Sequence, residues 1–227
     1  MSGRHDGRRE AVLAIDTATA RVVIATGSPG GVTDGISTWP AGYRHGETLL
    51  PSIGRFLGEQ NIRRSRLTGI VVGTGPGAFT GLRVGLATAK GIAHGLRIPL
   101  AGVSTAEALL AASGLDRPVL VLPAGPSDRL LVRPGQRPEP LPAGEEPEIR
   151  DGETLVALDL EGRAPADALE RGEAAHAGLG RELIRLGAER LRAGSPSELE
   201  TLVPEYVTLP RGVRAADGTV AWSRDHR

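Results

Sequence analysis

The sequence predicts an α/β protein. In the first half of the chain, apolar stretches of strand length alternate with segments of helical periodicity, in the order strand, strand, strand, helix, strand, helix. Such alternation is typical of sheets covered by helices. The composition agrees, because 40% hydrophobic and 24% charged residues over 227 positions are ordinary for a soluble globular protein. We therefore expect one generous domain, or two small ones that share a core.

The chain begins with a predicted hairpin. The segment AVLAIDTATARVVIATGS has two apolar strands around a small polar turn, Asp16 to Ala20, so a carboxylate ends the first strand. GGVTDGISTW is a candidate third strand. HGETLLPSIGRFLGEQ then has apolar residues at helical spacing, and we expect its regular helix to begin near Pro51, where proline is tolerated. These apolar residues are Leu49, Leu50, Ile53, Phe56 and Leu57.

A glycine-rich turn joins the next strand to the next helix. LTGIVVGTG is typical of a short buried strand, and GTGPGAFTGLRVGLATAKG continues it as a turn and a helix over residues 81–96. IPLAGVST is a further strand that runs into the short helix AEALLAAS. These segments complete the predicted first half of the chain.

The second half has weaker signals. PVLVLPAG, RLLVRPG and TLVALDLEG resemble strands, and the proline-rich, acidic residues 137–153 predict an exposed connection. ADALERGEAAHAGLGRELIRLGAERLRAG is largely helical, but Gly172, Gly178, Gly180 and Gly187 make it a mediocre helix unless tertiary packing stabilises it. Ser197 and Glu200 form a possible capping box for a brief last helix.

The glycine-rich turn fits neither common nucleotide-binding motif. A Walker loop needs four residues between its glycines and then a lysine, whereas five residues separate Gly75 from Gly81, and Leu82 and Arg83 follow. The dinucleotide fingerprint GxGxxG is missed by one residue. Arg83 opposes the dipole of the helix it begins, so it has an acidic or phosphate partner or reaches into solvent.

The helix after this turn has a stripe of small residues. Gly81, Gly85, Ala89 and Ala93 recur at every fourth position and form one nearly smooth face. A glycine inside a helix costs about 1 kcal/mol relative to alanine, so close packing must offset the loss. The stripe packs either on this chain's own sheet or against a second protein chain.

The sequence argues against several catalytic chemistries. It has no cysteine, and its five histidines never have HxxxH or HExxH spacing, so thiol chemistry and a helical zinc site are not expected. The serine hydrolase motif GxSxG is also absent. Asp16 is the remaining candidate, because a carboxylate at a strand end can position a magnesium ion or a water molecule. It can equally cap its own turn.

The charge balance bears on partners and location. With 27 basic and 27 acidic residues, the chain lacks the positive excess that drives avid binding of nucleic acid or anionic membranes. No apolar run reaches membrane-spanning length, and the polar start MSGRHDGRRE has no apolar segment after it. We expect a cytoplasmic protein without a membrane partner.

Five segments together resemble one family. LAIDTAT, HGETLLPSI, GPGAFTGLRVGLATAKGIA, IPLAGVSTAEAL and PEYV occur in this order, and they are similar to the TsaB (YeaZ) family. That family is the non-catalytic subunit of the bacterial machinery that makes threonylcarbamoyladenosine in tRNA. The resemblance is dense over residues 11–113 and thin beyond them.

The resemblance implies an actin-like fold, related to sugar kinases, Hsp70 and ribonuclease H, with a reduced second lobe. It divides the chain into a flexible N-terminus at residues 1–10, a first lobe with dimerisation helices at 11–113, a degenerate second lobe at 114–210 and a tail at 211–227. The glycine-rich turn would then retain the shape of an ancestral nucleotide site. The residues of this vestigial site are Asp16, Thr17, Gly75 and Gly77.

The resemblance also implies partners. TsaD would form a heterodimer with this chain, the ATPase TsaE would complete the enzyme, and tRNA would be met through the complex. Without TsaD, the chain would form a homodimer through the same apolar surface. The implied interface comprises Leu49, Leu50, Ile53, Leu57, Gly81, Arg83, Gly85, Ala89 and Ala93.

The resemblance implies no cofactor of the chain's own, since ATP and a metal would be used elsewhere in the complex. Thr105 and Leu109 align with the two metal-binding histidines of TsaD, and neither replaces an imidazole ligand. Two other functions rank lower. One is a nucleotide-dependent kinase of the same fold, with its site at Asp16 and the glycine-rich turn. The other is a metallopeptidase, for which no metal-ligand spacing is present.

Overall fold

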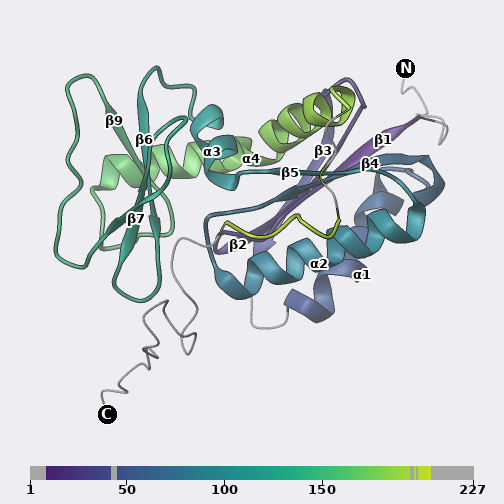
Figure 1. Cartoon of the computed structure of the whole chain (residues 1–227), viewed down its shortest axis with the longest axis horizontal. Coiled ribbons are helices and arrows are strands. Elements are labelled where there is room, and N and C mark those ends of the chain that lie inside the picture. The colour runs from purple at the N-terminus through teal and green to yellow at the C-terminus, as the bar shows by residue number, and fades with distance from the viewer. Residues whose placement is uncertain (1–8, 42–44, 195–196, 198, 206–227) are drawn as a thin grey trace, which may run out of the picture.

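The structure is a computed structural model of the whole chain, and it describes residues 9–41, 45–194, 197 and 199–205. Most of the expected flexible N-terminus and the whole expected tail, residues 211–227, lie outside the described residues. Within the described ranges, no helix combines the length and the apolar character needed to cross a membrane. The described elements form two sheets with helices around them (Figure 1).

The first sheet has five strands in the order β3-β2-β1-β4-β5. Strand β1 pairs antiparallel with β2 and parallel with β4, so that Ala14 lies opposite both Ala25 and Val71. The outer pairs are β2 with β3, antiparallel, and β4 with β5, parallel. The strands are β1 (Ala11–Asp16), β2 (Arg21–Gly27), β3 (Thr33–Pro40), β4 (Leu67–Gly73) and β5 (Leu100–Val103).

The second sheet repeats this topology in shorter form. Its order is β8-β7-β6-β9, in which β6 pairs antiparallel with β7 and parallel with β9. Each sheet therefore places its first strand between an antiparallel and a parallel neighbour, and the second sheet stops one strand short. The strands are β6 (Pro118–Pro123), β7 (Arg129–Val132), β8 (Glu139–Leu141) and β9 (Thr154–Ala157). The predicted α/β fold is confirmed, and the second sheet has fewer strands than the first.

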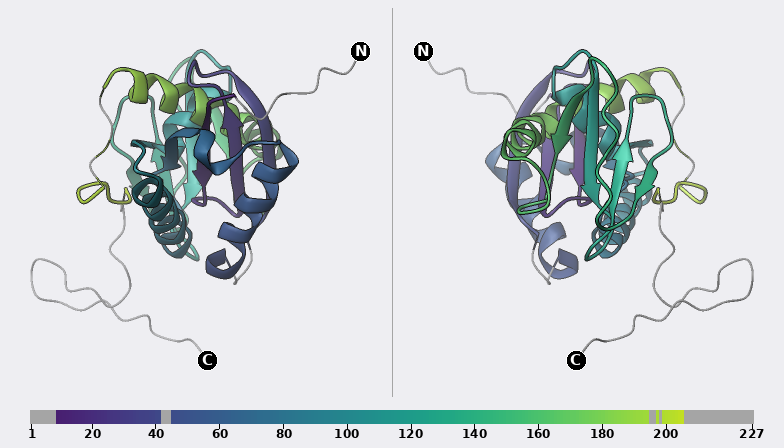
Figure 2. Two further views of the ribbon diagram at one scale, coloured as in Figure 1. Left: turned by 90° about the vertical axis from the view of Figure 1, so that its right-hand side faces the viewer. Right: turned by 90° about the vertical axis from the view of Figure 1, so that its left-hand side faces the viewer.

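The helices cover both faces of the first sheet (Figures 1 and 2). Helices α1 (His45–Glu59) and α2 (Phe79–Leu96) pack on one face, where Leu13 and Ile15 of β1 point. Helices α3 (Thr105–Ala112) and α4 (Ala166–Arg192) pack on the other, where Val12 and Ala14 point. Because β1 is buried on both faces, it is apolar at nearly every position. A 3-10 turn, η1 (Arg64–Arg66), precedes β4.

Helix α4 links the two halves of the chain. It follows the second sheet in sequence but packs against the strands of the first sheet. Its glycines permit close contact with both sheets, because a Cβ at Gly172 would clash with the Ala157 carbonyl of β9 and one at Gly187 with the side chain of Val71 of β4. Tertiary packing thus stabilises a helix of weak propensity, as expected. The proposed boundary at residues 113 and 114 stays a prediction.

Three local predictions are wrong. Helix α1 begins at His45, and Pro51 lies inside it because the chain continues helically on both sides. The expected connection at residues 137–153 contains β8, which pairs with β7. Residues 199–201 form a turn, and the Ser197 hydroxyl accepts a hydrogen bond from the Gly102 N–H at 3.1 Å instead of capping a helix.

Candidate functional site

The four residues of the expected vestigial nucleotide site lie close together at the end of β1. The Asp16 carboxylate is fully buried; its Oδ2 accepts a hydrogen bond from the Thr105 hydroxyl at 2.6 Å, and its Oδ1 accepts one from the Ala18 N–H at 2.9 Å. The same Thr105 oxygen accepts from the Gly75 N–H at 3.1 Å. One hydroxyl therefore joins the strand end, the glycine-rich turn and the start of α3.

The glycine-rich turn packs directly on the turn between β1 and β2. The Ala78 N–H donates to the Ala18 carbonyl at 2.7 Å, and a Cβ at Gly77 would clash with that carbonyl. Burial raises the pKa of the Asp16 carboxyl above its usual range, and the hydrogen bonds from Thr105 and Ala18 offset part of the rise. These contacts leave the Asp16 carboxylate buried with both oxygens hydrogen-bonded, so the site is closed in this conformation.

A second polar cluster holds the other side of the β1–β2 turn. His176 of α4 is buried and lies 3.2 Å from the Thr19 hydroxyl through its Nε2. Burial, together with the nearby Arg21, lowers the pKa of His176 to about 4, so the ring is neutral at pH 7. The Asp159 carboxylate accepts from the Ala20 N–H at 2.7 Å, and burial raises its pKa.

This cluster is completed at the surface by an ion pair. The two terminal guanidinium nitrogens of Arg21, Nη1 and Nη2, donate to the Glu173 carboxylate, each at 2.7 Å, which lowers the pKa of Glu173. Sequence reasoning missed these residues, because the contacts join positions more than 130 residues apart and no short motif contains them. The cluster ties the β1–β2 turn to α4 and to the loop after β9.

The positions that align with metal ligands are part of the core. Thr105 donates its hydrogen bond to Asp16, and Leu109 is fully buried among apolar side chains. Within the described ranges, no group of three or more histidine, cysteine, aspartate or glutamate side chains is arranged to hold a metal ion.

The small-residue stripe of α2 faces the interior of the chain. A Cβ at Gly81 would clash with the Thr17 carbonyl, and one at Gly85 would clash with the Thr17 hydroxyl, which itself donates to the Gly81 carbonyl at 2.7 Å. Ala89 and Ala93 are buried against the first sheet. The prediction that these four residues face a partner is therefore wrong, and internal packing explains the stripe.

The remaining expected interface residues divide between the core and the surface. Leu49 of α1 is buried in the core, whereas Leu50 of the same helix is 58% exposed. Ile53 and Leu57 are largely buried but line a groove between α1 and α2. Arg83 is exposed on α2, and its guanidinium lies over the Phe79 ring at 3.9 Å.

The groove lies beside a second small-residue stripe on the outward face of α2. Ala87, Gly91 and Gly95 are exposed and follow the same period of four, two positions away from the inward stripe. A Cβ at Gly91 or Gly95 would meet no atom within 4 Å. The groove has a volume of about 320 Å³. It is lined by Leu13, Leu50, Ile53, Gly54, Leu57, Arg64, Leu67, Gly91, Ile92, Gly95 and Leu96.

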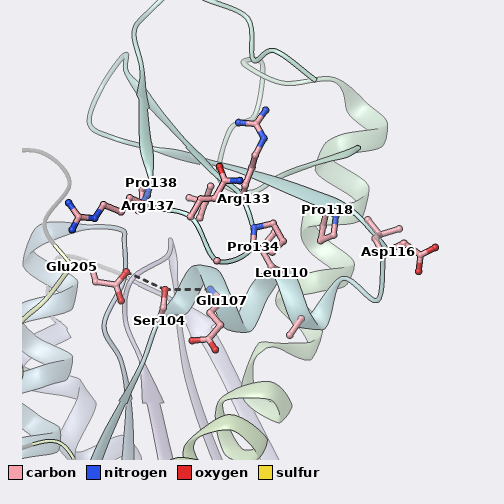
Figure 3. A pocket seen from close by; sticks show the side chains of 15 residues that line it. Ser104, Glu107, Leu110, Asp116, Pro118, Arg133, Pro134, Arg137, Pro138 and Glu205 are labelled. Atoms are coloured by element: carbon pink, nitrogen blue, oxygen red, sulfur yellow. Dashed lines mark hydrogen bonds between the residues drawn. The ribbon is translucent and has the colours of Figure 1, made fainter. Parts of the chain in front are cut away.

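A larger cleft, of about 990 Å³, lies between α3 and the turn after β7 (Figure 3). At its mouth the Ser104 hydroxyl donates to Glu205 at 3.2 Å. The same hydroxyl accepts from the N–H of Glu107, so that Ser104 caps α3. Arg133 in its wall pairs with the buried carboxylate of Glu153 at 2.8 Å, and this pair lowers the pKa of Glu153 to about 2. These polar groups satisfy one another, so their roles here are structural.

Known proteins resemble this chain in sequence. The family model described as "TsaD: tRNA N6-adenosine threonylcarbamoyltransferase" matches residues 28–133. The tRNA threonylcarbamoyladenosine biosynthesis protein TsaB of Escherichia coli (strain K12) is 35% identical over 94 residues, which are 41% of this chain and 40% of that protein. An uncharacterized protein of Mycobacterium tuberculosis is 38% identical over 105 residues, covering 43% of this chain and 47% of its own length.

A solved structure resembles the whole fold. YeaZ from Pseudomonas aeruginosa superposes with a TM-score of 0.68 at 23% identity and covers 87% of this chain and all of that one. The chain is therefore similar to TsaB over part of its sequence and to YeaZ in its fold. The matching segment spans less than half the length of the curated relatives, including TsaB. Because the match covers 87% of this chain, the similarity in fold extends over most of it.

Proposed function

We propose that the chain is the non-catalytic subunit required to form N6-threonylcarbamoyladenosine at position 37 of tRNA. In this role it binds and orients the catalytic subunit TsaD, together with the ATPase TsaE, and meets tRNA in the cytoplasm through the complex. The similarity to Escherichia coli TsaB, named for threonylcarbamoyladenosine biosynthesis, supports the pathway. The contrast between a closed polar site and an open apolar face supports the role.

The closed site argues against chemistry on this chain. Asp16, the carboxylate predicted to serve a kinase-like reaction, is buried and already accepts two hydrogen bonds. A phosphate reaching it would have to displace the Ala18 carbonyl from the glycine-rich turn and the Thr105 hydroxyl from the carboxylate. Such opening would break these hydrogen bonds, and each polar group left buried without a partner would cost about 1–3 kcal/mol.

The α1–α2 face supports binding of a partner. Its groove is apolar except for one arginine, and Leu50 is exposed beside it. The exposed glycines of α2 allow another helix to approach closely, and packed helix pairs of this kind build four-helix bundles. We therefore assign the TsaD interface to the outward stripe and the groove, with Leu50, Ile53 and Leu57 retained from the predicted set. Without TsaD, we expect the same face to pair with a second copy of the chain.

The proposal is tested by reconstitution. Purified TsaD and TsaE of the same organism, with ATP, threonine, bicarbonate, the threonylcarbamoyl-adenylate synthase and tRNA, should form the modified nucleoside only when this chain is added. The chain alone should neither hydrolyse ATP nor modify tRNA. Full modification without the chain would contradict the proposed requirement, and ATP hydrolysis by the chain that is lost in Asp16→Ala would establish the kinase-like alternative.

A further inference from the structure

The charges of this chain are unevenly distributed. Residues 45–97, which contain α1, η1 and α2, have seven arginine and lysine residues against two glutamates and therefore carry a net charge of +5. Because the whole chain is neutral, the remaining residues carry −5. The basic residues are Arg55, Arg63, Arg64, Arg66, Arg83, Lys90 and Arg97. Helix α2 has no acidic residue at all.

Several of these cations have no carboxylate partner in the part of the chain that the structure describes. Arg63, Arg64 and Arg97 are exposed, Lys90 is half-buried, and no described carboxylate lies within ion-pair distance of any of them. Arg55 pairs with the exposed Glu59 at 4.0 Å, a separation at which an exposed pair contributes little. The surface around the groove therefore carries an excess of positive charge.

Arg64 lies at the groove itself. It is the one charged residue in the groove lining, and its guanidinium is 3.8 Å from the Cβ position of Gly54 on α1. A helix that fills the groove removes water from this guanidinium. Burying an unpaired charge is strongly unfavourable unless the partner supplies an opposite charge.

We propose that the positive charge around the groove selects the partner. The partner that fits is an apolar helix flanked by carboxylates, one of which reaches Arg64, while the same +5 charge opposes pairing with a second copy of the chain. In an isologous dimer the patch meets itself, so like charges face one another. This inference rests on the proposed function, and it names the chemistry by which a TsaD-type partner is preferred over self-association.

An RNA ligand fits this face less well. Proteins that bind single-stranded RNA stack its bases on aromatic side chains, and the groove lining contains none. The aliphatic side chains of the groove would then contact the charged phosphate backbone of the RNA. A protein helix covers both the apolar groove and the cations.

The test is the salt dependence of the two assemblies. Sedimentation equilibrium of the full chain, alone and with TsaD of its own organism, is measured at about 0.05 M and about 0.5 M salt, where screening differs strongly. The Kd of the heterodimer should rise about tenfold or more with salt, whereas the Kd of the homodimer should fall. At low salt, Arg64→Glu should likewise raise the Kd of the heterodimer and lower the Kd of the homodimer. Arg137→Glu, an exposed arginine outside this face, is the matched control and should change neither Kd.

The outcomes separate this inference from the proposed function. A heterodimer that forms but responds neither to salt nor to Arg64→Glu overturns the inference and leaves the proposed function intact. Absence of a heterodimer at either salt concentration overturns both. If fluorescently labelled tRNA binds the chain alone and Arg64→Glu abolishes that binding, the face is an RNA site and the inference is wrong.

Discussion

The two faces of α2 have the same residue pattern and opposite surroundings. Gly81 and Gly85 face inward, where a Cβ would clash with Thr17. Gly91 and Gly95 face outward, where a Cβ would meet nothing within 4 Å. The comparison shows that a period of small residues identifies a helix face that can be approached closely. It does not show whether the approaching backbone belongs to the same chain.

The energetic consequences of the two faces differ. The inward glycines lower the helix propensity of α2. In return they allow the hydrogen bond from Thr17 to Gly81 and the close packing around the buried Asp16, which is hydrogen-bonded by Thr105. The outward glycines lose about 1 kcal/mol each relative to alanine and gain no described contact within the chain. That loss is offset only if another molecule packs there, which is the physical basis of the proposed interface.

The largest effect should come from bulk on the inward face. Gly85→Leu is expected to destabilise the fold by more than about 4 kcal/mol, because the new side chain cannot avoid Thr17 without moving the β1–β2 turn. Urea unfolding followed by circular dichroism measures the loss. A variant that folds with unchanged stability would show that the inward face is not packed as described.

The next largest effect should come from His176, which contacts the β1–β2 turn from α4. The pKa of His176 is about 4 in the folded chain against 6.5 for a free imidazole, so folding favours the neutral ring. Its contribution to stability is complete above pH 6.5 and is lost as the pH falls to about 4, by at most about 3 kcal/mol. Urea unfolding from pH 7.5 to 4 should show this loss in the wild type and a smaller one in His176→Gln. Parallel pH profiles would contradict the assignment.

A smaller effect is expected from the hydrogen bond between Thr105 and the buried Asp16. Thr105→Val removes the hydroxyl that donates to Asp16 and accepts from Gly75, and should cost about 1–3 kcal/mol. Because a donated hydrogen bond favours the charged carboxylate, the cost should be greater above the raised pKa of Asp16 than below it. Thr105→Ser, which keeps the hydroxyl, is the control. Equal losses for both substitutions would assign the effect to packing instead.

The smallest effect should come from the outward face. Gly91→Ala is expected to stabilise the isolated chain by up to about 1 kcal/mol, since the helix gains propensity and the methyl group meets no neighbour. Thermal unfolding checks the sign. Destabilisation by this methyl group would mean that the outward face is packed in the isolated chain.

Local features of the fold were predictable from the sequence. The strand that ends at Asp16, the glycine-rich turn and the short helix after Ser104 follow from apolar runs and turn residues that lie close together in the chain. The stripe on α2 was also visible, but its direction depends on Thr17, which lies 64 residues before Gly81.

Features that depend on long-range contacts could not be predicted in this way. No local pattern indicates that α4 crosses to the first sheet, or that His176 and Asp159 meet the β1–β2 turn. Gly91 and Gly95 repeat the same period as the inward stripe. Only the absence of neighbours around them identifies the open face.

The most direct test of the central claim is sedimentation velocity of this chain mixed with TsaD of its own organism, comparing wild type, Gly91→Leu and Gly58→Leu. Gly58 is an exposed helix glycine with no atom near its Cβ position, and it does not line the groove. We predict that Gly91→Leu folds but loses the heterodimer, while Gly58→Leu retains it. A folded Gly91→Leu chain that binds TsaD with wild-type affinity would contradict the assignment of the outward face of α2 as the interface.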